Sequence, residues 1–447
     1  MKRNSAADSS SNSSGGIHPQ DTSPWSAVSV ILPYLKRYAT RIIVGFLALI
    51  SVDFLQLWIP RIIKNAVDDL QMGVATSNRL LVYGGYIIAI ALAIAALRFI
   101  WRKLLLGFSR LLEMHLRNRM ISHILTLDKT FFQRMTTGEI MALATNDLSS
   151  VQLATGMGMV AAVDALFMGM AAIGFMAFID LRLTLIAVAP MPFLAILTRF
   201  LSSRLHRRFK RVQEQFSTLT EYVRSTFSSI RLIKAYNQEK AQAERFNNLG
   251  ETYVRNNLRL AAIYGTLFPL SGLIGNLSLF LVLFFGGRMA INGTITAGDF
   301  VAFITYLFIM TWPMMALGWV SDLFQRGVTS LDRINALLEE RPTLKAPENV
   351  KFSSPVRGTI TIKNLSFNYP NQQRPILRNI SLNIRQGLFL GIVGPTGAGK
   401  TTLCNLLARL YPVPAGRILF DDMDVNRLSL EAIRGAIAYV PQEVVLF

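Results

Sequence analysis

Residues 394–401 read Gly-Pro-Thr-Gly-Ala-Gly-Lys-Thr and fit the pattern G-x-x-x-x-G-K-[ST] of a phosphate-binding loop. Glycines let such a loop turn its backbone N–H groups toward phosphate oxygens, at the N-terminus of the helix that follows. Lys400 supplies a positive charge for the β- and γ-phosphates, and the Thr401 hydroxyl is a ligand for Mg²⁺. The loop therefore predicts a binding site for a nucleoside triphosphate with Mg²⁺.

The sequence on both sides supports this interpretation of the loop. Leu388–Val393 is typical of a short buried strand, and Thr401–Leu410 has the pattern of a helix. This order is the one that the motif requires. We expect two further strands, at Ile360–Tyr369 and Ile437–Val440.

Upstream of the loop, the chain is far more apolar than a soluble domain of its length requires. Of its 447 residues 51% are hydrophobic, and the mean hydropathy is +0.37. Six windows have few charges and the length of about 20 residues that a helix needs to cross a lipid bilayer. They are Ile42–Arg61, Leu80–Trp101, Gly156–Ile179, Leu183–Phe200, Leu260–Gly287 and Phe300–Val320.

The net charge of +19 suggests nucleic acid as a partner, but the positive residues are concentrated in particular loops. Seven Lys/Arg lie between the second and third windows, and twelve lie between Arg199 and Arg255. By the positive-inside rule, these loops and both termini are cytoplasmic. The distribution indicates a multi-pass protein of the inner (plasma) membrane that has no nucleic-acid partner.

Motifs in the loops and after the last window resemble one family, the ABC exporters. They are Phe131–Asp147, Ser229–Glu239 and Ser330–Glu339. In that family a six-helix membrane half precedes a nucleotide-binding domain, and short loop helices dock onto this domain. The implied fold class is an all-α six-helix transmembrane domain followed by a partial α/β P-loop nucleotide-binding domain.

The resemblance divides the chain into four parts. The first residues, rich in Ser, Asn, Asp and Gly, are typical of a disordered tail rather than a signal peptide. The expected parts are a disordered cytoplasmic segment at 1–36, a transmembrane domain at 37–340 with long cytoplasmic loops at 102–155 and 201–257, a linker at 341–357, and the N-terminal part of a nucleotide-binding domain at 358–447.

The resemblance also implies roles for individual residues of the nucleotide-binding segment. Tyr369 stands where the family has an aromatic residue that stacks on adenine, and a tyrosine of the core or of an edge strand is the alternative. Gln442 matches the glutamine that approaches Mg²⁺ and the attacking water, so it is the catalytic candidate and, with Thr401, a metal ligand. The residues expected to bind ATP are Tyr369, Gly394, Thr396, Gly397, Ala398, Gly399, Lys400, Thr401 and Thr402.

The sequence departs from the family pattern in two places. Asp421-Asp422 stands where the family often has Asp-Gly, which changes a turn. The sequence ends at Phe447, before the family's Leu-Ser-Gly-Gly-Gln signature, the acidic strand end with its general-base Glu, and the switch His. Because hydrolysis needs a base and a positioned water, enzymatic activity remains open for this chain.

The implied function is that of half an ATP-driven exporter for a hydrophobic or amphipathic small molecule, whether a drug, a lipid or a peptide. Phe308–Trp319 and Ile392–Gly397 resemble the multidrug-resistance-like half-transporters of bacteria. This branch favours a heterodimer with a second half-transporter, and a homodimer stays open. The alternative is a truncated, non-hydrolysing membrane protein that at most binds nucleotide or pairs with an intact half.

Three charged residues fall within the apolar windows, Asp53, Arg98 and Asp164. A charge at the centre of a membrane helix costs about 3 kcal/mol on insertion scales, so these side chains are expected to face a cavity or one another. For Asp164 three alternatives are open: a role in the substrate path, a buried polar contact and an interfacial position.

We expect the 447-residue chain by itself not to hydrolyse ATP, because it supplies the phosphate cradle without the other groups that hydrolysis needs. The measurement is vanadate-sensitive phosphate release by the purified chain, with Lys400→Ala as the control. Turnover that Lys400→Ala abolishes would contradict the expectation.

Overall fold

The structure is a computed structural model that describes residues 24–344, 347, 350, 352, 356–369 and 374–442. It divides into two compact units. The membrane unit comprises Ser23–His115 and Leu148–Leu331, and the cytoplasmic unit comprises Leu116–Asp147 and Asp332–Phe447.

Helices alone build the described part of the membrane unit. They are α1 (Pro24–Arg37), α2 (Ala39–Gln71), α3 (Ser77–Trp101), α4 (Gly107–Ile124), α7 (Leu148–Leu153), α8 (Met159–Ile179), α9 (Leu181–Val188), α10 (Met191–Ser228), α11 (Ile230–Ala235), α12 (Glu239–Leu281), α13 (Gly287–Ile291) and α14 (Ala297–Glu339). The π-helical turns η1 (Arg102–Leu106), η3 (Ala154–Gly158) and η4 (Val282–Gly286) continue α3 into α4, α7 into α8 and α12 into α13.

Among the described residues, 5 helices are long and apolar enough to cross a membrane. They are Ala39–Gln71, Ser77–Ile124, Thr137–Ile179, Gly272–Ile291 and Ala297–Glu339, and they contain or overlap five of the six predicted windows. The fourth window, Leu183–Phe200, is divided between two helices in the structure. There α9 ends at Val188 and α10 begins at Met191. Pro190 interrupts the helix because it has no N–H and disfavours helical geometry in the residue before it.

Residues 24–36, which the sequence placed in a disordered segment, form most of α1; residues 1–23 lie outside the described residues. The helix has partners within the membrane unit. Val30 is buried, and the ring of Tyr34 lies 5.6 Å from the ring of His115 on α4. Apolar and aromatic contacts of this kind stabilise a helix that the polar composition of the preceding tail does not predict.

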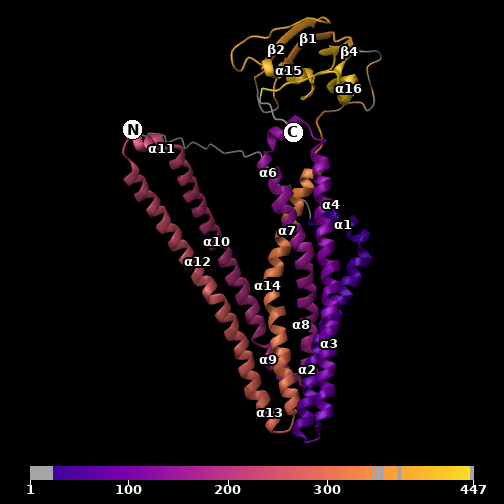
Figure 1. Cartoon of the computed structure of the whole chain (residues 1–447), viewed down its shortest axis with the longest axis vertical. Helices are drawn as coiled ribbons and strands as arrows, with labels where there is room; N and C mark the ends of the chain where they lie inside the picture. The colour runs from indigo at the N-terminus through magenta and orange to yellow at the C-terminus, as the bar shows by residue number, and fades with distance from the viewer. Residues whose placement is uncertain are drawn as a thin grey trace, which may run out of the picture. The chain divides into compact units, whose positions relative to one another are not determined.

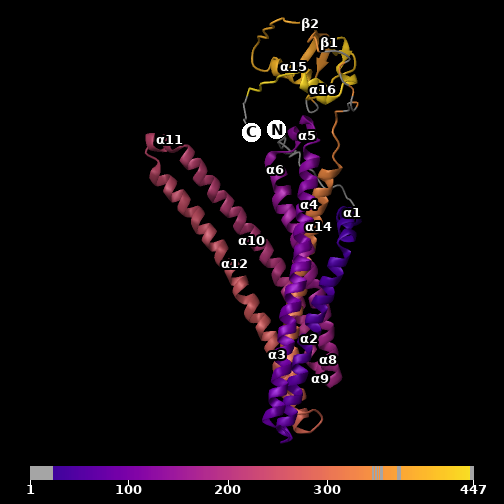
Figure 2. The same cartoon turned by 45° about the vertical axis from the view of Figure 1, so that its right-hand side comes forward.

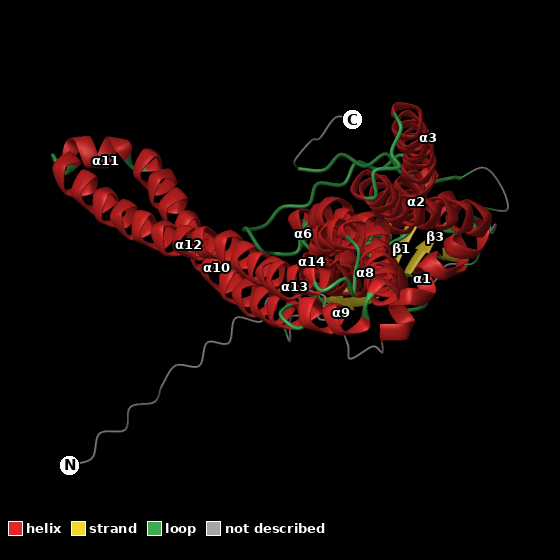
Figure 3. Ribbon diagram, turned by 90° about the horizontal axis from the view of Figure 1, so that it is seen from below, coloured by secondary structure: helices red, strands yellow, loops and turns green. Residues whose placement is uncertain are grey.

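The helices α10 and α12 lie side by side, and α11 joins them at one end (Figure 1). The same pairing is visible in the other two views (Figure 2, Figure 3). The Tyr222 hydroxyl on α10 donates a hydrogen bond to the Gln242 carbonyl oxygen on α12 at 3.0 Å. Farther along the pair, the rings of Phe216 and Tyr253 lie 5.9 Å apart.

The cytoplasmic unit contains a small sheet with short helices. Its elements are α5 (Lys129–Arg134), α6 (Thr137–Ala142), β1 (Ile360–Phe367), β2 (Leu377–Ile384), α15 (Lys400–Leu407), β3 (Ile418–Phe420), β4 (Met423–Asp424) and α16 (Leu430–Gly435). The strand order is β2-β1-β3-β4, and all three pairings are antiparallel. The core between sheet and helices includes the fully buried Leu365, Leu406, Ile418 and Leu428.

The strand predicted at Ile360–Tyr369 is confirmed as β1, whereas the two strands predicted at Leu388–Val393 and Ile437–Val440 were wrong for this structure. Both segments are irregular, and Phe389, Val393 and Val440 are 97%, 96% and 82% exposed. A strand that is buried on both faces needs a hydrogen-bonded strand beside it. Within the described residues, the sheet consists of β1 to β4 and neither segment pairs with it.

Asp421 and Asp422 form the turn between β3 and β4, and both have a positive φ, 45° and 64°. Two consecutive positive φ values are typical of a type I′ hairpin turn, in which glycine is favoured. Asp421 is held there because its carboxylate accepts hydrogen bonds from the backbone N–H groups of Arg357 at 2.7 Å and Thr359 at 2.9 Å. Among the residues that the structure describes, none donates a hydrogen bond of this kind to Asp422.

Replacing Asp422 with Gly is expected to stabilise the cytoplasmic unit by about 1 kcal/mol, because glycine adopts the left-handed conformation without a steric cost. The measurement is the thermal unfolding midpoint. Asp421→Gly is the matched control and should lower the midpoint, since it removes the hydrogen bonds to residues 357–359. A lower midpoint for Asp422→Gly would contradict the turn assignment.

Candidate functional site

The phosphate-binding loop runs from an irregular segment directly into α15, which begins at Lys400. Gly397 and Gly399 have φ values of +85° and +87°, a conformation that side-chain-bearing residues rarely adopt. A methyl group on Gly399 would lie 2.7 Å from Cδ2 of Leu377 on β2. Glycine is therefore required at this position both for the backbone turn and for the close approach of the sheet.

Lys400 and Thr401 are the first two residues of α15, directly after this loop. The Lys400 Nζ donates hydrogen bonds to the carbonyl oxygens of Gly394 at 2.7 Å and Pro395 at 2.9 Å, so its charge lies over the loop. The first N–H groups of a helix have no partner within the helix and attract anions. With the exposed Thr401 hydroxyl beside them, these groups fit a triphosphate with a bound Mg²⁺.

The other residues expected to bind ATP differ in their surroundings. Thr396 and Ala398 are exposed in the loop, and Thr402 is buried one residue after the predicted metal ligand. The Tyr369 hydroxyl lies 3.0 Å from Oγ1 of Thr402, which brings Tyr369 to the helix after the loop. Its half-buried ring packs against the core, so its contact with adenine stays a prediction.

Gln442, the catalytic and metal-binding candidate, is an exposed residue near the end of the described chain. Within the described residues, its side chain makes no hydrogen bond to the phosphate-binding loop. Its role also stays a prediction.

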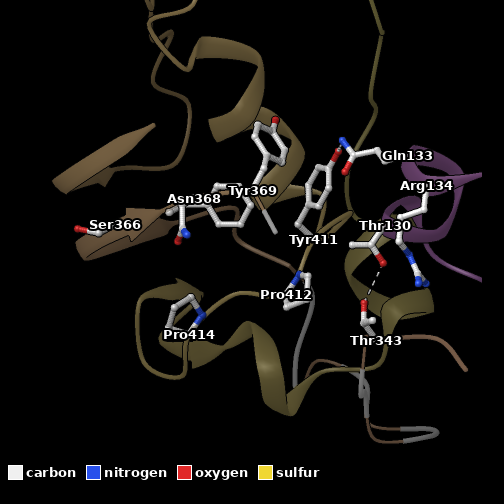
Figure 4. A pocket seen from close by; sticks show the side chains of 11 residues that line it. Thr130, Gln133, Arg134, Thr343, Ser366, Asn368, Tyr369, Tyr411, Pro412 and Pro414 are labelled. Carbon is white, nitrogen blue, oxygen red and sulfur yellow. Dashed lines mark hydrogen bonds between the residues drawn. The ribbon is translucent and has the colours of Figure 1, made fainter. Parts of the chain in front are cut away.

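The structure adds a cavity of about 1100 Å³ in the cytoplasmic unit that the sequence did not suggest (Figure 4). It is lined by Thr130, Gln133, Arg134, Thr343, Ser366, Phe367, Asn368, Tyr369, Tyr411, Pro412 and Pro414. These residues come from the first cytoplasmic loop, the linker after α14 and the nucleotide-binding segment. The cavity thus brings together three parts of the chain around Tyr369.

Tyr411 connects these parts. Its side chain is 1% exposed, and its hydroxyl accepts a hydrogen bond of 2.6 Å from Nε2 of Gln133 on α5. The rings of Tyr411 and Tyr369 lie 5.1 Å apart, edge to face, and the Lys129 ammonium lies 5.6 Å from the centroid of Tyr411. Burial raises the pKa of Tyr411 to about 12, so its hydroxyl stays neutral at physiological pH.

Asp128 fixes α5 from its other end. Its Oδ1 caps α5 by accepting hydrogen bonds from the backbone N–H and the hydroxyl of Thr130. Its Oδ2 accepts hydrogen bonds from the backbone N–H groups of Thr343 at 2.5 Å and Leu344 at 3.0 Å. Burial alone would raise the pKa of Asp128, but these donors outweigh it and hold the pKa below the ordinary range.

Comparison with known proteins gives the context of this site. The family model described as "ABC transporter transmembrane region" matches residues 42–314, and the model described as "ABC transporter" matches residues 377–447. The first model covers more than half of the chain.

The chain belongs to the ABC transporter family.

Its relatives include proteins named for multidrug resistance. The "Probable multidrug resistance ABC transporter ATP-binding/permease protein YheI" of Bacillus subtilis is 34% identical over 416 residues, which cover 93% of this chain and 71% of the relative. The "Multidrug resistance-like ATP-binding protein MdlA" of Escherichia coli is 34% identical over 418 residues, 93% of this chain and 70% of the relative. An "ATP-dependent lipid A-core flippase" of Nitrosococcus oceani is 30% identical over 332 residues, 74% of this chain and 55% of the relative.

The two family matches agree with the order of the apolar helices and the sheet along the chain, and they establish its cellular location. It is a multi-pass protein of the plasma membrane, in which an apolar helical region precedes a cytoplasmic nucleotide-binding domain. The antiparallel strands β1 to β4 with α15 belong to the beginning of that domain.

Sequence reasoning missed Asp128, Gln133 and Tyr411 in this ABC transporter. Asp128 carried a usable signal, because Asp directly before a helix is a common N-cap. Gln133 lies in the Phe131–Asp147 motif, but nothing in that motif identifies its hydrogen-bond partner Tyr411, which is 278 positions away. Only the folded cytoplasmic unit reveals that pair.

Replacing Asp128 with Asn is expected to free the amides of Thr343 and Leu344, because Asn has a single acceptor oxygen while Asp128 uses both. Hydrogen bonds to a charged acceptor contribute about 2 kcal/mol, so hydrogen exchange at these amides should become about 30-fold faster. Glu139→Gln in α6 is the control and should leave their exchange unchanged.

The same tether should depend on pH in a defined direction. Because the pKa of Asp128 is lowered in the folded state, its stabilisation is complete above the unfolded value of about 3.9 and is lost as pH falls through the lower folded value. Protection of Thr343 and Leu344 that is unchanged by Asp128→Asn would contradict the assigned contact.

Proposed function

We propose that this chain is one half of an ATP-driven exporter that moves a hydrophobic or amphipathic small molecule out of the cytoplasm. The observation that carries the proposal is the phosphate-binding loop with Lys400 over it, in the unit that also holds the first cytoplasmic loop. The proposed domains are the transmembrane domain at 37–340 and the nucleotide-binding segment at 358–447, joined by the linker at 341–357.

The nucleotide would be held by the chain's own backbone and side chains. The backbone N–H groups of Gly397, Gly399 and the start of α15 would bind the phosphates, and Lys400 would add a positive charge. Thr401 and Gln442 would hold Mg²⁺, and the Tyr369 ring would stack on adenine. Hydrolysis of the bound ATP to ADP and phosphate would supply the free energy for transport.

A direct route leads from this site to the first cytoplasmic loop. Tyr369 touches Tyr411, and Tyr411 accepts the hydrogen bond of Gln133 on α5. Asp128 then joins the start of α5 to the linker at Thr343. A displacement of Tyr369 therefore acts through packed groups on both α5 and the chain that leaves α14.

The proposed partner is a second half-transporter, as a heterodimer rather than a homodimer, because Phe308–Trp319 and Ile392–Gly397 resemble the branch in which such pairs are common. The surface at the end of the α10–α12 pair, where α11 lies, supports the proposal that the chain binds a protein partner. There α11 and its flanks expose the apolar side chains of Phe227, Leu232 and Tyr236 to solvent. Exposed apolar groups in a cytoplasmic loop favour a docking role.

The substrate class rests on the apolar character of the membrane unit. An apolar groove of about 490 Å³ between α9–α10 and α12 is lined by Ala189, Pro190, Phe193, Leu197, Leu270, Leu273, Ile274 and Leu277. The relatives named for multidrug resistance and for lipid A-core flipping support a drug or a lipid as the cargo.

The test is ATP-dependent uptake of a fluorescent hydrophobic drug into inside-out vesicles that contain the full-length transporter. Lys400→Ala should abolish uptake and weaken binding of a fluorescent ATP analogue about 10- to 100-fold, since it removes charged hydrogen bonds to the phosphates. Lys363→Ala, at an exposed lysine on β1, is the matched control and should change neither. Undiminished uptake by Lys400→Ala would overturn the proposal.

A further inference from the structure

The apolar groove of the membrane unit continues, along the same two helices, into a row of arginines. Among the described residues, every side chain that lines this groove of about 490 Å³ is apolar, including Phe193 and Leu197 on α10 and Leu270 and Leu277 on α12. Phe193 and Leu277 are exposed, so the described side chains leave the groove open. A water molecule finds no hydrogen-bond partner on such a surface, and the groove therefore favours an apolar group as its occupant.

Helical periodicity places the arginines in line with the groove. Arg204 follows Leu197 by 7 positions and Arg208 follows it by 11, so they lie about two and three turns farther along the same face of α10. On α12, Arg259 precedes Leu270 by 11 positions, which again makes about three turns. The face of each helix that is apolar at the groove is therefore basic beyond it.

The antiparallel pairing of α10 with α12 brings these arginines to one level. The helices run side by side (Figure 2), and the contact between the Phe216 and Tyr253 rings fixes their register. Leu197 and Leu270 are the last lining residues of the groove in this direction. Since Arg208 and Arg259 stand at equal distances from these two leucines, both helices contribute positive charge to the same end of the groove.

The charges of these arginines are not used within the membrane unit. Among the described residues, Arg204, Arg208 and Arg259 form no ion pair. Near the other end of the helix pair, by contrast, Arg224 binds Glu221 at 2.7 Å. Three guanidinium groups without a carboxylate are available to an anion, and phosphate is an anion whose geometry suits them.

The length of this surface matches one leaflet of a bilayer. From the lining residue Pro190 to Arg204 there are 14 positions, which is about 21 Å along a helix. One leaflet with its headgroups is about 20–22 Å thick, half of a bilayer of about 40–45 Å. The guanidinium carbon of Arg204 lies 4.3 Å from the centroid of the Phe200 ring, at the end of the fourth apolar window. By the positive-inside rule, this is the cytoplasmic end of the window.

We propose that the groove and the arginines together bind one anionic phospholipid of the cytoplasmic leaflet. One acyl chain occupies the groove between α10 and α12, and the phosphate lies among Arg204, Arg208 and Arg259. Basic clusters directly beside a membrane span bind anionic headgroups in this way. The lipid is a resident of this surface, and its binding does not depend on which molecule is exported.

The first test compares two lipids on the purified full-length transporter by native mass spectrometry. Dioleoylphosphatidylglycerol, which is anionic, should bind at least about tenfold more tightly than dioleoylphosphatidylcholine, which has the same acyl chains and no net charge. This preference should be lost in the triple variant Arg204→Gln, Arg208→Gln and Arg259→Gln. A matched control removes three positive charges at the α11 end of the helix pair and should keep the preference; it carries Arg224→Gln, Lys234→Gln and Lys240→Gln.

Equal affinity of the unmodified transporter for the two lipids would overturn the proposal, and so would a preference that the triple variant retains. The three arginines are exposed or half-buried, so their replacement leaves the core of the membrane unit intact. Because the readout is binding, a transporter that binds the lipid but exports nothing refutes the proposed function alone.

A second test asks whether the acyl chain uses the groove. Leu273→Trp puts a larger side chain at a lining position that is 60% exposed, and it should weaken binding of dioleoylphosphatidylglycerol about tenfold by filling the groove. Glycerol 1-phosphate carries the phosphate without acyl chains and should not displace the lipid at equal concentration. Undiminished binding by Leu273→Trp would overturn the place of the acyl chain, and displacement by glycerol 1-phosphate would overturn the lipid in favour of a soluble phosphate.

Discussion

The hydrogen bond between Gln133 and Tyr411 is the contact on which the organisation of the cytoplasmic unit depends. It joins the first cytoplasmic loop to the nucleotide-binding segment across 278 positions of sequence, with a donor–acceptor distance of 2.6 Å. Tyr411 is buried and its hydroxyl is neutral. This hydroxyl is the group that binds Gln133 on α5. Because the same ring touches Tyr369, the phosphate site and the loop share one aromatic residue.

A second set of contacts, made by Asp128, fixes the other end of α5. Asp128 binds the start of α5 and the linker residues Thr343 and Leu344 with its two oxygens. The helix α5 is thus fixed at both ends, by a charged acceptor at one end and by Tyr411 at the other. A short helix of 6 residues has little stability of its own, so these two anchors define its position.

The sequence predicts this fold best where the determining interactions are local or are set by lipid. Apolar length alone located five of the six windows, and the glycine pattern of residues 394–401 predicted a tight turn, in which Gly397 and Gly399 have positive φ values. It failed at Leu388–Val393, because an apolar run is consistent with a buried strand but does not show which strand lies beside it. It also missed Gln133 and Tyr411, whose partnership exists only through the folding of distant segments.

The interruption at Ala189-Pro190 has a mechanical consequence. On the neighbouring helix α12, Pro269 also lacks an N–H, and residues next to both prolines line the same groove. Each proline removes a backbone N–H donor, so bending the α10–α12 pair at this level has fewer helical hydrogen bonds to break. A helix of 38 residues such as α10 is about 57 Å long, so a rotation of about one degree at the prolines moves α11 by about 1 Å. A small bend at the prolines beside the groove therefore produces a larger displacement of α11 at the far end of the pair.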